Sequence, residues 1–327
     1  MHGEIRKMSG ESIDAGKIVG HESQWQQLTG LFDSGKLTPA WMLCGPAGIG
    51  KASFAKAIAE RIFLAANHVN VAIQMASGVF PNYKLISDED GNITIDKLRP
   101  LIEFLQFKAH LPGWRVVIVD AADNMNRFAA NALLKSLEEP PEQTLIMLIA
   151  HQPARILPTL RSRCLKLSFD KLSPEQVAES LGLSANNPAV QIADGRLGYT
   201  KFLHEQQLAA KFAELLRQIT PAIAKRGALP MNFLKSFAKD NKESLEHLLE
   251  IWRWWVYQLA QPNGYTTTVW SDFYAEQRAM ATHQHWLDVY QQLSNLFDRA
   301  NRCHLDNYHV LLCAIETMKN PGIYNAA

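Results

Sequence analysis

The arrangement of apolar and polar positions changes along the chain near residue 170. Before that point, short apolar runs that suit buried strands alternate with longer stretches of helical periodicity. The five strand-like runs are residues 41–44, 83–87, 116–119, 145–150 and 165–169. The run at 116–119 consists of β-branched residues only, which is typical of a parallel strand buried on both faces. Strands separated by helices predict an α/β domain with a mainly parallel sheet covered on both sides.

Helical periodicity and helix-ending residues predict three helices between these strands. The predicted helices are residues 52–65, 97–108 and 127–138. We expect Asp96 to cap the second helix, with Pro100 tolerated in its first turn. The third helix should end before Pro140, because a proline disfavours the helical conformation in the residue that precedes it.

After residue 170 the chain is almost entirely helical in its pattern. Ser173-Pro174-Glu175-Gln176 is a capping box with proline at the first helical position, and Gly182 is a suitable stop for the helix that it starts. We place one boundary near Asp170 and a second near Glu205. The predicted organisation is therefore an α/β domain over 1–170, a small helical region over 171–205 and a helical domain over 206–327.

Composition limits the possible functions. Of the 327 residues, 47% are hydrophobic and 20% are charged, which is a globular rather than a disordered composition. The formal net charge of +1 excludes binding of DNA through bulk positive charge. No run approaches the roughly 20 apolar residues of a membrane span, and the N-terminus has no apolar leader region. We expect a cytoplasmic protein that does not bind a membrane.

A glycine-rich segment between the first predicted strand and the first predicted helix has the pattern of a phosphate-binding loop. The segment is Gly45-Pro46-Ala47-Gly48-Ile49-Gly50-Lys51. Glycines let the backbone approach a phosphate closely, and the N–H groups at the start of the helix attract an anion. Lys51 would reach the outer phosphates. The segment predicts a site for ATP or ADP.

Two parts of an active ATPase site are missing from their expected positions. The residue after Lys51 is Ala52, where a Ser or Thr hydroxyl would bind Mg²⁺. Asp120 ends the strand at 116–119 and suits a metal-assisting acid, but Ala121 stands where active ATPases of this type carry a glutamate. Ser53 and Asp123 are near, but neither is in register, so we expect ordinary structural roles for both. The pattern predicts nucleotide binding without efficient turnover, and leaves Mg²⁺ binding open.

A further set of motifs lies between residues 130 and 164. These are Ala-Asn-Ala-Leu-Leu-Lys at 130–135, Leu-Glu-Glu-Pro-Pro at 137–141 and Leu-Pro-Thr-Leu-Arg-Ser-Arg-Cys at 157–164. In this order and spacing they resemble the clamp-loader AAA+ proteins, which include the gamma/tau and delta-prime subunits of bacterial DNA polymerase III and the replication factor C subunits. The resemblance covers roughly residues 18–200, with Ile18-Val19-Gly20-His21 similar to the segment on the adenine side of the nucleotide. It implies an AAA+ P-loop domain, a helical lid and an all-α collar.

The resemblance also implies a role for one arginine. Ser162-Arg163-Cys164 matches the family's Ser-Arg-Cys motif, whose arginine enters the ATP site of a neighbouring subunit. Arg163 is therefore expected to be an arginine finger acting in trans, because its guanidinium stabilises charge on a transferring phosphate. The alternative is a structural ion pair with a local acid. Arg161 is expected to support the fold or to pair locally.

Departures from the family pattern favour the delta-prime type over the motor type. Besides Ala52 and Ala121, the sequence has Ala-His-Gln-Pro at 150–153, where motors often carry a threonine that senses the γ-phosphate. Gly198 stands where a lid arginine would sense nucleotide, with Arg196 near but out of register. The four cysteines include no C-x-x-C pair, and residues 65–83 contain none at all. The zinc module of many clamp-loader subunits is therefore not expected.

The leading hypothesis is a DNA polymerase III clamp-loader subunit that has little or no ATPase activity of its own. The implied partners are gamma/tau and delta in a hetero-oligomer, and, through the complex, a sliding clamp and primed DNA. The alternative is an active gamma/tau-like motor in which Ser53 or Asp123 compensates. A third, weaker hypothesis is a DNA-binding module that acts through the collar.

Aromatic and charged residues in the C-terminal half have simpler explanations. Trp252, Trp254 and Trp255 could stack on single-stranded DNA, but core or subunit packing is favoured. A modest spread of basic residues near Lys235 and Lys239 is broken by acids and suits a solvated face. His283 and His285 lack nearby carboxylate or cysteine support, so a metal site is not expected there.

Overall fold

We analysed a computed structural model of the chain, which describes residues 18–87, 92–107, 111–224, 227–241, 244–262, 270–303 and 305–320. The chain forms two compact units. The first comprises Met1–Ser180 together with Gly195–Gly198, and the second comprises Leu181–Asp194 and Tyr199–Ala327. The predicted boundaries near residues 170 and 205, which would set off a separate helical lid, stay predictions.

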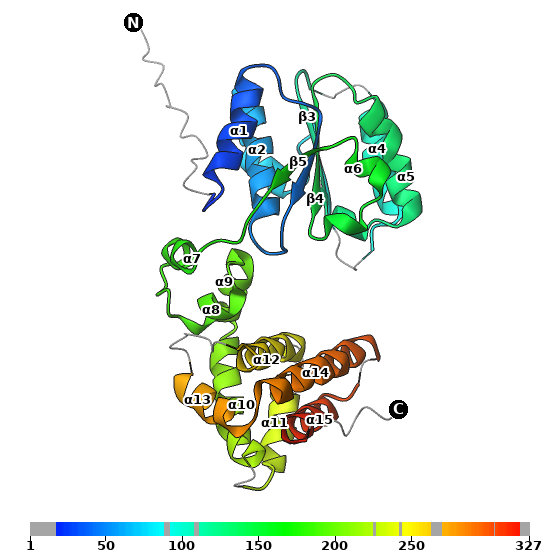
Figure 1. Cartoon of the computed structure of the whole chain (residues 1–327). Coiled ribbons are helices and arrows are strands. Elements are labelled where there is room, and N and C mark those ends of the chain that lie inside the picture. The colour runs from blue at the N-terminus through cyan, green and yellow to red at the C-terminus, as the bar shows by residue number, and fades with distance from the viewer. Residues whose placement is uncertain are drawn as a thin grey trace, which may run out of the picture. The chain divides into compact units, whose positions relative to one another are not determined.

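A five-stranded parallel sheet forms the centre of the first unit (Figure 1). Its strands are β1 (Ala40–Cys44), β2 (Tyr83–Ser87), β3 (Arg115–Asp120), β4 (Thr144–Ala150) and β5 (Leu165–Ser168), in the order β2-β3-β4-β1-β5. All five strands lie where the apolar runs predicted them, so the predicted α/β fold is confirmed. The carboxyl ends of β1, β4 and β5 lie together, because Cys44 pairs with both Ala150 and Ser168.

Helices cover both faces of this sheet, as Figure 1 shows. On one face, α1 (Glu22–Asp33), α2 (Lys51–Ala65) and α3 (Val71–Ala76) pack against every second strand residue, among them Leu43, Ile118 and Met147. On the other face, α4 (Ile95–Gln106), α5 (Arg127–Glu138) and α6 (Pro158–Arg161) pack against the alternate residues, among them Met42, Val117 and Leu148. Burial on both faces explains why the strands have continuous apolar runs rather than an alternating pattern.

Helix α4 differs from the sequence prediction at its start. It begins at Ile95, so Thr94 rather than Asp96 occupies the capping position, and the Asp96 carboxylate lies 3.2 Å from Arg99 on the helix surface. The prediction that Asp96 caps this helix was therefore wrong. Pro100 is the sixth helical residue instead of lying in the first turn, and the predicted end at Lys108 is outside the described residues.

The other helix predictions in this unit hold closely. Helix α5 has the predicted bounds, and the side chain of Asn126 accepts a hydrogen bond from the Ala129 N–H at 2.8 Å. Helix α7 (Pro174–Leu181) has the predicted capping box. The Ser173 N–H donates to the Gln176 side chain at 2.9 Å, and the Gln176 N–H donates to the Ser173 hydroxyl at 3.2 Å.

The second unit is helical throughout the residues that the structure describes. Its helices are α8 (Pro188–Ala193), α9 (Leu197–Glu205, of which the first two residues belong to the other unit), α10 (Leu208–Ile223), α11 (Met231–Asp240), α12 (Leu245–Leu259), α13 (Ser271–Met280), α14 (His283–Cys303) and α15 (Asn307–Lys319). None of the helices in the described ranges is long and apolar enough to cross a membrane.

The tryptophans of α12 form part of the core of this unit. Trp252 and Trp255 are both 0% exposed, whereas Trp254 is only partly buried. The Trp255 indole N–H donates to Gln277 at 2.9 Å, and the amide of Gln277 donates in turn to the Thr220 hydroxyl at 2.8 Å. The favoured interpretation of core packing is confirmed for Trp252 and Trp255.

Candidate nucleotide site and candidate arginine finger

The glycine-rich loop lies at the carboxyl edge of the sheet, where parallel α/β folds bind their ligands. Strand β1 ends at Cys44 and helix α2 begins at Lys51, as the sequence predicted for a phosphate loop. The loop fits tightly between its neighbours: a Cβ atom at Gly45 would lie 2.4 Å from the carbonyl oxygen of Phe169. Only glycine is compatible with this close approach.

Lys51 is buried against the loop that precedes it. Its side chain is 2% exposed, and its Nζ donates to the carbonyl oxygens of Gly45 at 2.6 Å and Pro46 at 2.5 Å. Burial lowers the pKa of Lys51 to about 8, against a smaller opposing effect of Asp120. The ammonium is thus close to the phosphate position but is hydrogen-bonded to backbone oxygens.

Asp120 and His151 face each other at the ends of β3 and β4. His151 Nε2 lies 3.7 Å from Asp120 Oδ1. Burial raises the pKa of Asp120, although His151 and Lys51 act in the opposite direction. Burial also lowers the pKa of His151, and the nearby Lys51 adds to that effect. Both groups are therefore shifted toward their neutral forms, and no sequence motif indicated this pairing.

Asp123 binds the backbone of the turn that follows β4. It lies in a short 3₁₀ turn (Ala122–Asn124), and its two carboxylate oxygens accept the backbone N–H groups of His151 at 2.9 Å and Gln152 at 3.0 Å. These bonds hold the turn that follows β4. Ser53, the other residue considered as a substitute, is exposed on α2, whereas Ala52 is half-buried. Both carboxylate oxygens of Asp123 are thus already engaged, and Ser53 is open to solvent.

Residues 195–198 contact the phosphate loop within the same unit. The Gly198 N–H donates to the carbonyl oxygen of Gly48 at 3.2 Å, and a Cβ atom at Gly48 would lie 3.3 Å from Cβ of Arg196. His21 contacts the loop from another side, because its Nε2 lies 2.8 Å from the Ile49 carbonyl oxygen. The sequence located Gly198 and His21 by resemblance alone, and the folded chain brings both to the loop.

The residues at this site fit the phosphates of a nucleotide better than a fully coordinated metal ion. Glycines 45, 48 and 50, Lys51 and the start of α2 are the parts of a phosphate cradle. Asp120 Oδ1 is buried without a hydrogen-bond partner, which leaves an acceptor for a cation or water. A hydroxyl at position 52 is missing, so a Mg²⁺ ion would lack one of its usual ligands.

Arg163 lies at the amino-terminal ends of the strands, whereas its own phosphate loop lies at their carboxyl ends. It lies two residues before β5, whereas the loop follows the carboxyl end of β1, and these two strands are parallel neighbours. The four residues of β5 and Phe169, which lie between Arg163 and the level of the loop, span roughly 16 Å in extended form. Arg163 Nη2 lies 2.6 Å from Glu138 Oε1, and Nη1 donates to the Thr159 carbonyl oxygen at 2.9 Å. Its side chain is still 36% exposed.

The fold and this site define the class. A five-stranded parallel sheet in this strand order, with a phosphate loop after β1, is an AAA+ P-loop domain followed by helices. Residues 20–173 match the family model described as DNA polymerase III, delta subunit. Over this region the chain is similar to the delta-prime subunits of DNA polymerase III.

The curated relatives that the chain matches include subunits of DNA polymerase III. The DNA polymerase III subunit delta' of Pseudomonas aeruginosa is 38% identical over 154 residues, which cover 44% of this chain and 46% of the relative. The gamma subunit of Buchnera aphidicola is 27% identical over 168 residues, 49% of this chain and 46% of the relative. The chain thus spans about half the length of the curated relatives that it matches.

One solved structure resembles the chain more extensively but more weakly. A DNA polymerase III gamma-subunit-related protein of Thermotoga maritima aligns with 90% of this chain and 99% of its own, with 19% identity and a TM-score of 0.45. At this score the likeness carries no argument about site or function.

Proposed function

We propose that the chain works as the delta-prime-type subunit of a clamp loader. In this proposal it assembles with gamma/tau and delta subunits in the cytoplasm, and the complex opens a sliding clamp and places it on primed DNA. Its AAA+ region, its match to the family model and its similarity to a delta-prime subunit support the assignment. Its own nucleotide site has little or no ATPase activity, and Arg163 acts in the site of a neighbouring subunit.

The low ATPase activity that we propose for this chain follows from the residues around the phosphate loop. Hydrolysis needs a metal ion to offset developing charge and a group that positions the attacking water. Ala52 and Ala121 supply neither group. The nearby Asp123 has both carboxylate oxygens bound to backbone N–H groups. ATP or ADP would be held by the loop and Lys51, with Mg²⁺ coordinated by Asp120 at most.

The observation that most supports the trans role is the position of Arg163. It lies at the far edge of the sheet from its own loop, so it would reach a phosphate only in another subunit. Its partner in the chain is Glu138, whose side chain is 47% exposed. An ion pair between exposed groups is worth only about 0–1 kcal/mol. The guanidinium can therefore exchange Glu138 for a phosphate at small cost.

The test is reconstitution of the complex from purified gamma/tau, delta and this chain. The Arg163→Ala variant should assemble normally by size-exclusion chromatography and keep its melting temperature. The DNA- and clamp-stimulated ATPase of the complex should fall at least severalfold. Arg161→Ala is the matched control, because Arg161 is an exposed arginine two residues away. An unchanged ATPase in a correctly assembled Arg163→Ala complex would refute the finger.

The motor function is the second candidate, since Lys51 and Asp120 are both retained at the loop. It predicts that the purified chain by itself hydrolyses ATP in a Mg²⁺-dependent reaction. Lys51→Ala should then abolish the activity. Absence of hydrolysis in the wild-type chain, with nucleotide binding preserved, would favour the proposed non-catalytic site.

A further inference from the structure

Asp120 and His151 carry polar atoms that no other described residue satisfies. Asp120 is the last residue of β3, and His151 directly follows β4, its parallel neighbour, so both stand at the carboxyl edge of the sheet. Asp120 Oδ1 and His151 Nδ1 are buried, and neither has a hydrogen-bond partner among the residues that the structure describes. The imidazole Nε2 lies 3.7 Å from Asp120 Oδ1, which is beyond hydrogen-bond distance. Buried polar groups in folded proteins almost always have a partner, so this pair indicates a place for a ligand.

The spacing of the two side chains suits a shared metal ion. Two atoms that each lie about 2.1 Å from one ion are about 3.0 Å apart at right angles and about 4.2 Å apart on opposite sides of it. The 3.7 Å between Asp120 Oδ1 and His151 Nε2 falls between these limits. One ion can therefore contact both atoms.

The backbone holds both residues in place. Asp120 is paired with Ile149 in the register of β3 and β4. The His151 N–H donates to Asp123 Oδ1 at 2.9 Å, and the Gln152 N–H donates to Asp123 Oδ2 at 3.0 Å. A binding site needs ligands that rigid elements keep in position, and here the sheet and the turn after β4 do so.

Two protein ligands are too few to hold an ion by themselves. Among the described residues, no group of three or more His, Cys, Asp or Glu side chains is arranged to hold a metal ion. The remaining ligands would be water and the phosphate oxygens of a nucleotide. Lys51 acts electrostatically on both Asp120 and His151, so the phosphate loop is near the pair. Negative phosphates would also offset the charge of Lys51, which by itself repels a cation.

The kinds of donor atom select the ion. Mg²⁺ prefers oxygen ligands, and the hydroxyl that would normally bind it is missing at Ala52. An imidazole nitrogen suits divalent ions of the first transition row, and Mn²⁺ in this row also accepts carboxylate and water oxygens. One carboxylate oxygen together with one imidazole nitrogen therefore favours a transition-metal ion over Mg²⁺.

We propose that Asp120 and His151 together bind a divalent transition-metal ion, such as Mn²⁺, that also contacts the phosphates of a nucleotide held by the loop at 45–51. The proposal rests on the nucleotide binding in the proposed function and names the ion that accompanies it. It concerns binding only, because the ion brings no group in place of the glutamate that is missing at Ala121. The low turnover proposed for this site is therefore unchanged.

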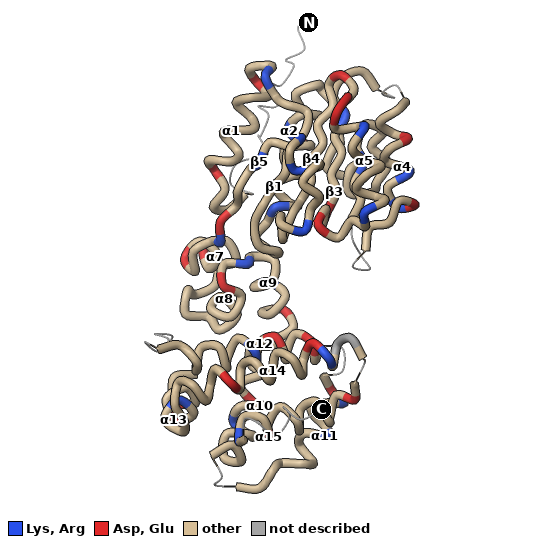
Figure 2. Tube along the Cα trace, turned by 45° about the vertical axis from the view of Figure 1, so that its right-hand side comes forward, with Lys and Arg blue, Asp and Glu red and all other residues tan. Residues whose placement is uncertain are grey.

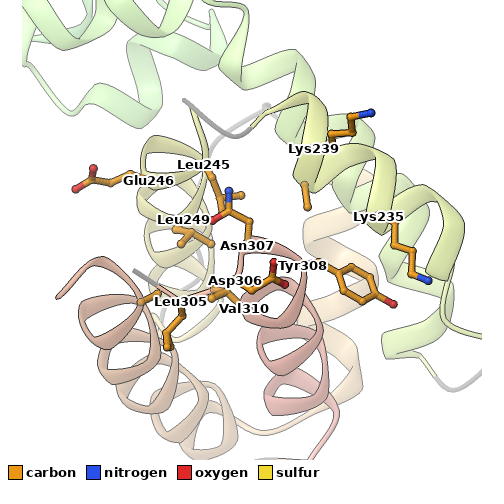
Figure 3. Close-up of a pocket in the computed structure, with 12 residues that line it drawn as sticks. Lys235, Lys239, Leu245, Glu246, Leu249, Leu305, Asp306, Asn307, Tyr308 and Val310 are labelled. Carbon is orange, nitrogen blue, oxygen red and sulfur yellow. The ribbon is translucent and has the colours of Figure 1, made fainter. Parts of the chain in front are cut away.

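A cavity of about 780 Å³ in the second unit has no comparable donor atoms. It lies among α11, α12, α14 and α15, and none of its described lining side chains has a buried nitrogen or oxygen without a partner (Figure 3). Acidic and basic residues are interspersed along the helices of this unit (Figure 2). The cavity is lined by charges of both signs, namely Lys235, Lys239, Glu246 and Asp306. It therefore selects neither an anion nor a cation.

Pulsed electron paramagnetic resonance tests whether a histidine nitrogen binds the ion. The full-length chain is labelled with ¹⁵N in histidine only and mixed with Mn²⁺ and the non-hydrolysable ATP analogue AMP-PCP. Nitrogen atoms of lysine, of the non-histidine backbone and of adenine then give no ¹⁵N signal. We expect ¹⁵N coupling to Mn²⁺ in the wild-type chain and its loss in His151→Ala. His204→Ala is the matched control, because His204 is an exposed histidine of the second unit, and it should keep the coupling.

The affinity of a fluorescent ATP analogue gives a second readout. It is measured with Mn²⁺, with Mg²⁺ and with EDTA. Mn²⁺ should tighten binding at least threefold more than Mg²⁺ does, and His151→Ala should remove this difference. This variant should keep its melting temperature, because the structure shows no hydrogen bond from the His151 ring to another described residue. His204→Ala should bind like wild type with each metal.

The outcomes separate this proposal from the proposed function. Nucleotide binding without histidine coupling, or coupling that His151→Ala retains, would overturn the metal site and leave the nucleotide site standing. An equal effect of Mn²⁺ and Mg²⁺ in the wild-type chain would overturn the preference for a transition metal. Absence of nucleotide binding with either metal and with EDTA would overturn both the metal site and the nucleotide binding on which it rests.

Discussion

Arg163 and Glu138 form an ion pair within the first unit, with Nη2 and Oε1 2.6 Å apart. Both side chains are substantially exposed, at 36% and 47%. The pair joins Arg163, two residues before β5, to the last residue of α5. It was the alternative that the sequence left open for Arg163, and it coexists with the proposed role in trans because an exposed pair exchanges partners easily.

Glu138→Gln should therefore leave the fold intact and free Arg163 for a partner. The expected loss of stability is below about 1 kcal/mol, measured by urea unfolding, since exposed pairs contribute little. In the reconstituted complex, the ATPase should stay at the wild-type level or rise, in contrast to the loss expected for Arg163→Ala. A large fall in ATPase for Glu138→Gln would mean that Arg163 needs its own Glu138 to function.

Asp123→Asn should destabilise the chain without acting on hydrolysis directly. The carboxylate accepts two backbone N–H groups, those of His151 and Gln152. An amide has one oxygen, so one of these N–H groups loses its partner, at a cost of about 1–3 kcal/mol. Urea unfolding measures the loss. Asp33→Asn is the control, because Asp33 belongs to an exposed pair with Arg61 and should cost under about 1 kcal/mol. Wild-type stability with altered nucleotide turnover would instead support Asp123 as a compensating catalytic group.

Nucleotide affinity should decline in alkaline solution because of Lys51. Burial lowers its pKa to about 8 in the free chain. Phosphates favour the charged ammonium, so they raise this pKa when they bind. Affinity should therefore be constant below pH about 8 and fall above it, by up to about tenfold per pH unit.

A fluorescent ATP analogue, titrated from about pH 6.5 to 9.5, measures this dependence. In Lys51→Arg the guanidinium stays charged throughout, so any binding that this variant retains should show no decline. Constant wild-type affinity up to pH 9.5 would contradict the lowered pKa.

Two tryptophans two residues apart on α12 should differ sharply in their contribution to stability. Trp252 is 0% exposed and its indole N–H lies 3.1 Å from the sulfur of Met318. Trp252→Ala should lower the free energy of unfolding by about 3–5 kcal/mol, as for other buried large-to-small changes. Trp254 is only partly buried, so Trp254→Ala should cost less than half as much. Equal losses would mean that the burial of the two side chains does not differ in solution.

The strands and most helix bounds of the first unit could be predicted because their signals are local. A continuous β-branched run is compatible with a strand covered on both faces, and the capping box of α7 needs only four consecutive residues. Helix α4 was less predictable at its start, because Thr94 and Asp96 are both suitable capping residues.

The sequence by itself determined the sheet, the glycine-rich loop, and the two alanines that stand where a hydroxyl and a glutamate were expected, since each depends on which residue stands at a position in a short motif. Only the tertiary structure decided which distant groups meet. It placed Asp123 on the backbone of His151 and Gln152, Gly198 on Gly48, and Arg163 at the far edge of the sheet from its own loop. It also assembled a cavity in the second unit from residues of α11, α12, α14 and α15. Such contacts join residues tens to more than a hundred positions apart, and strand order and helix packing set them.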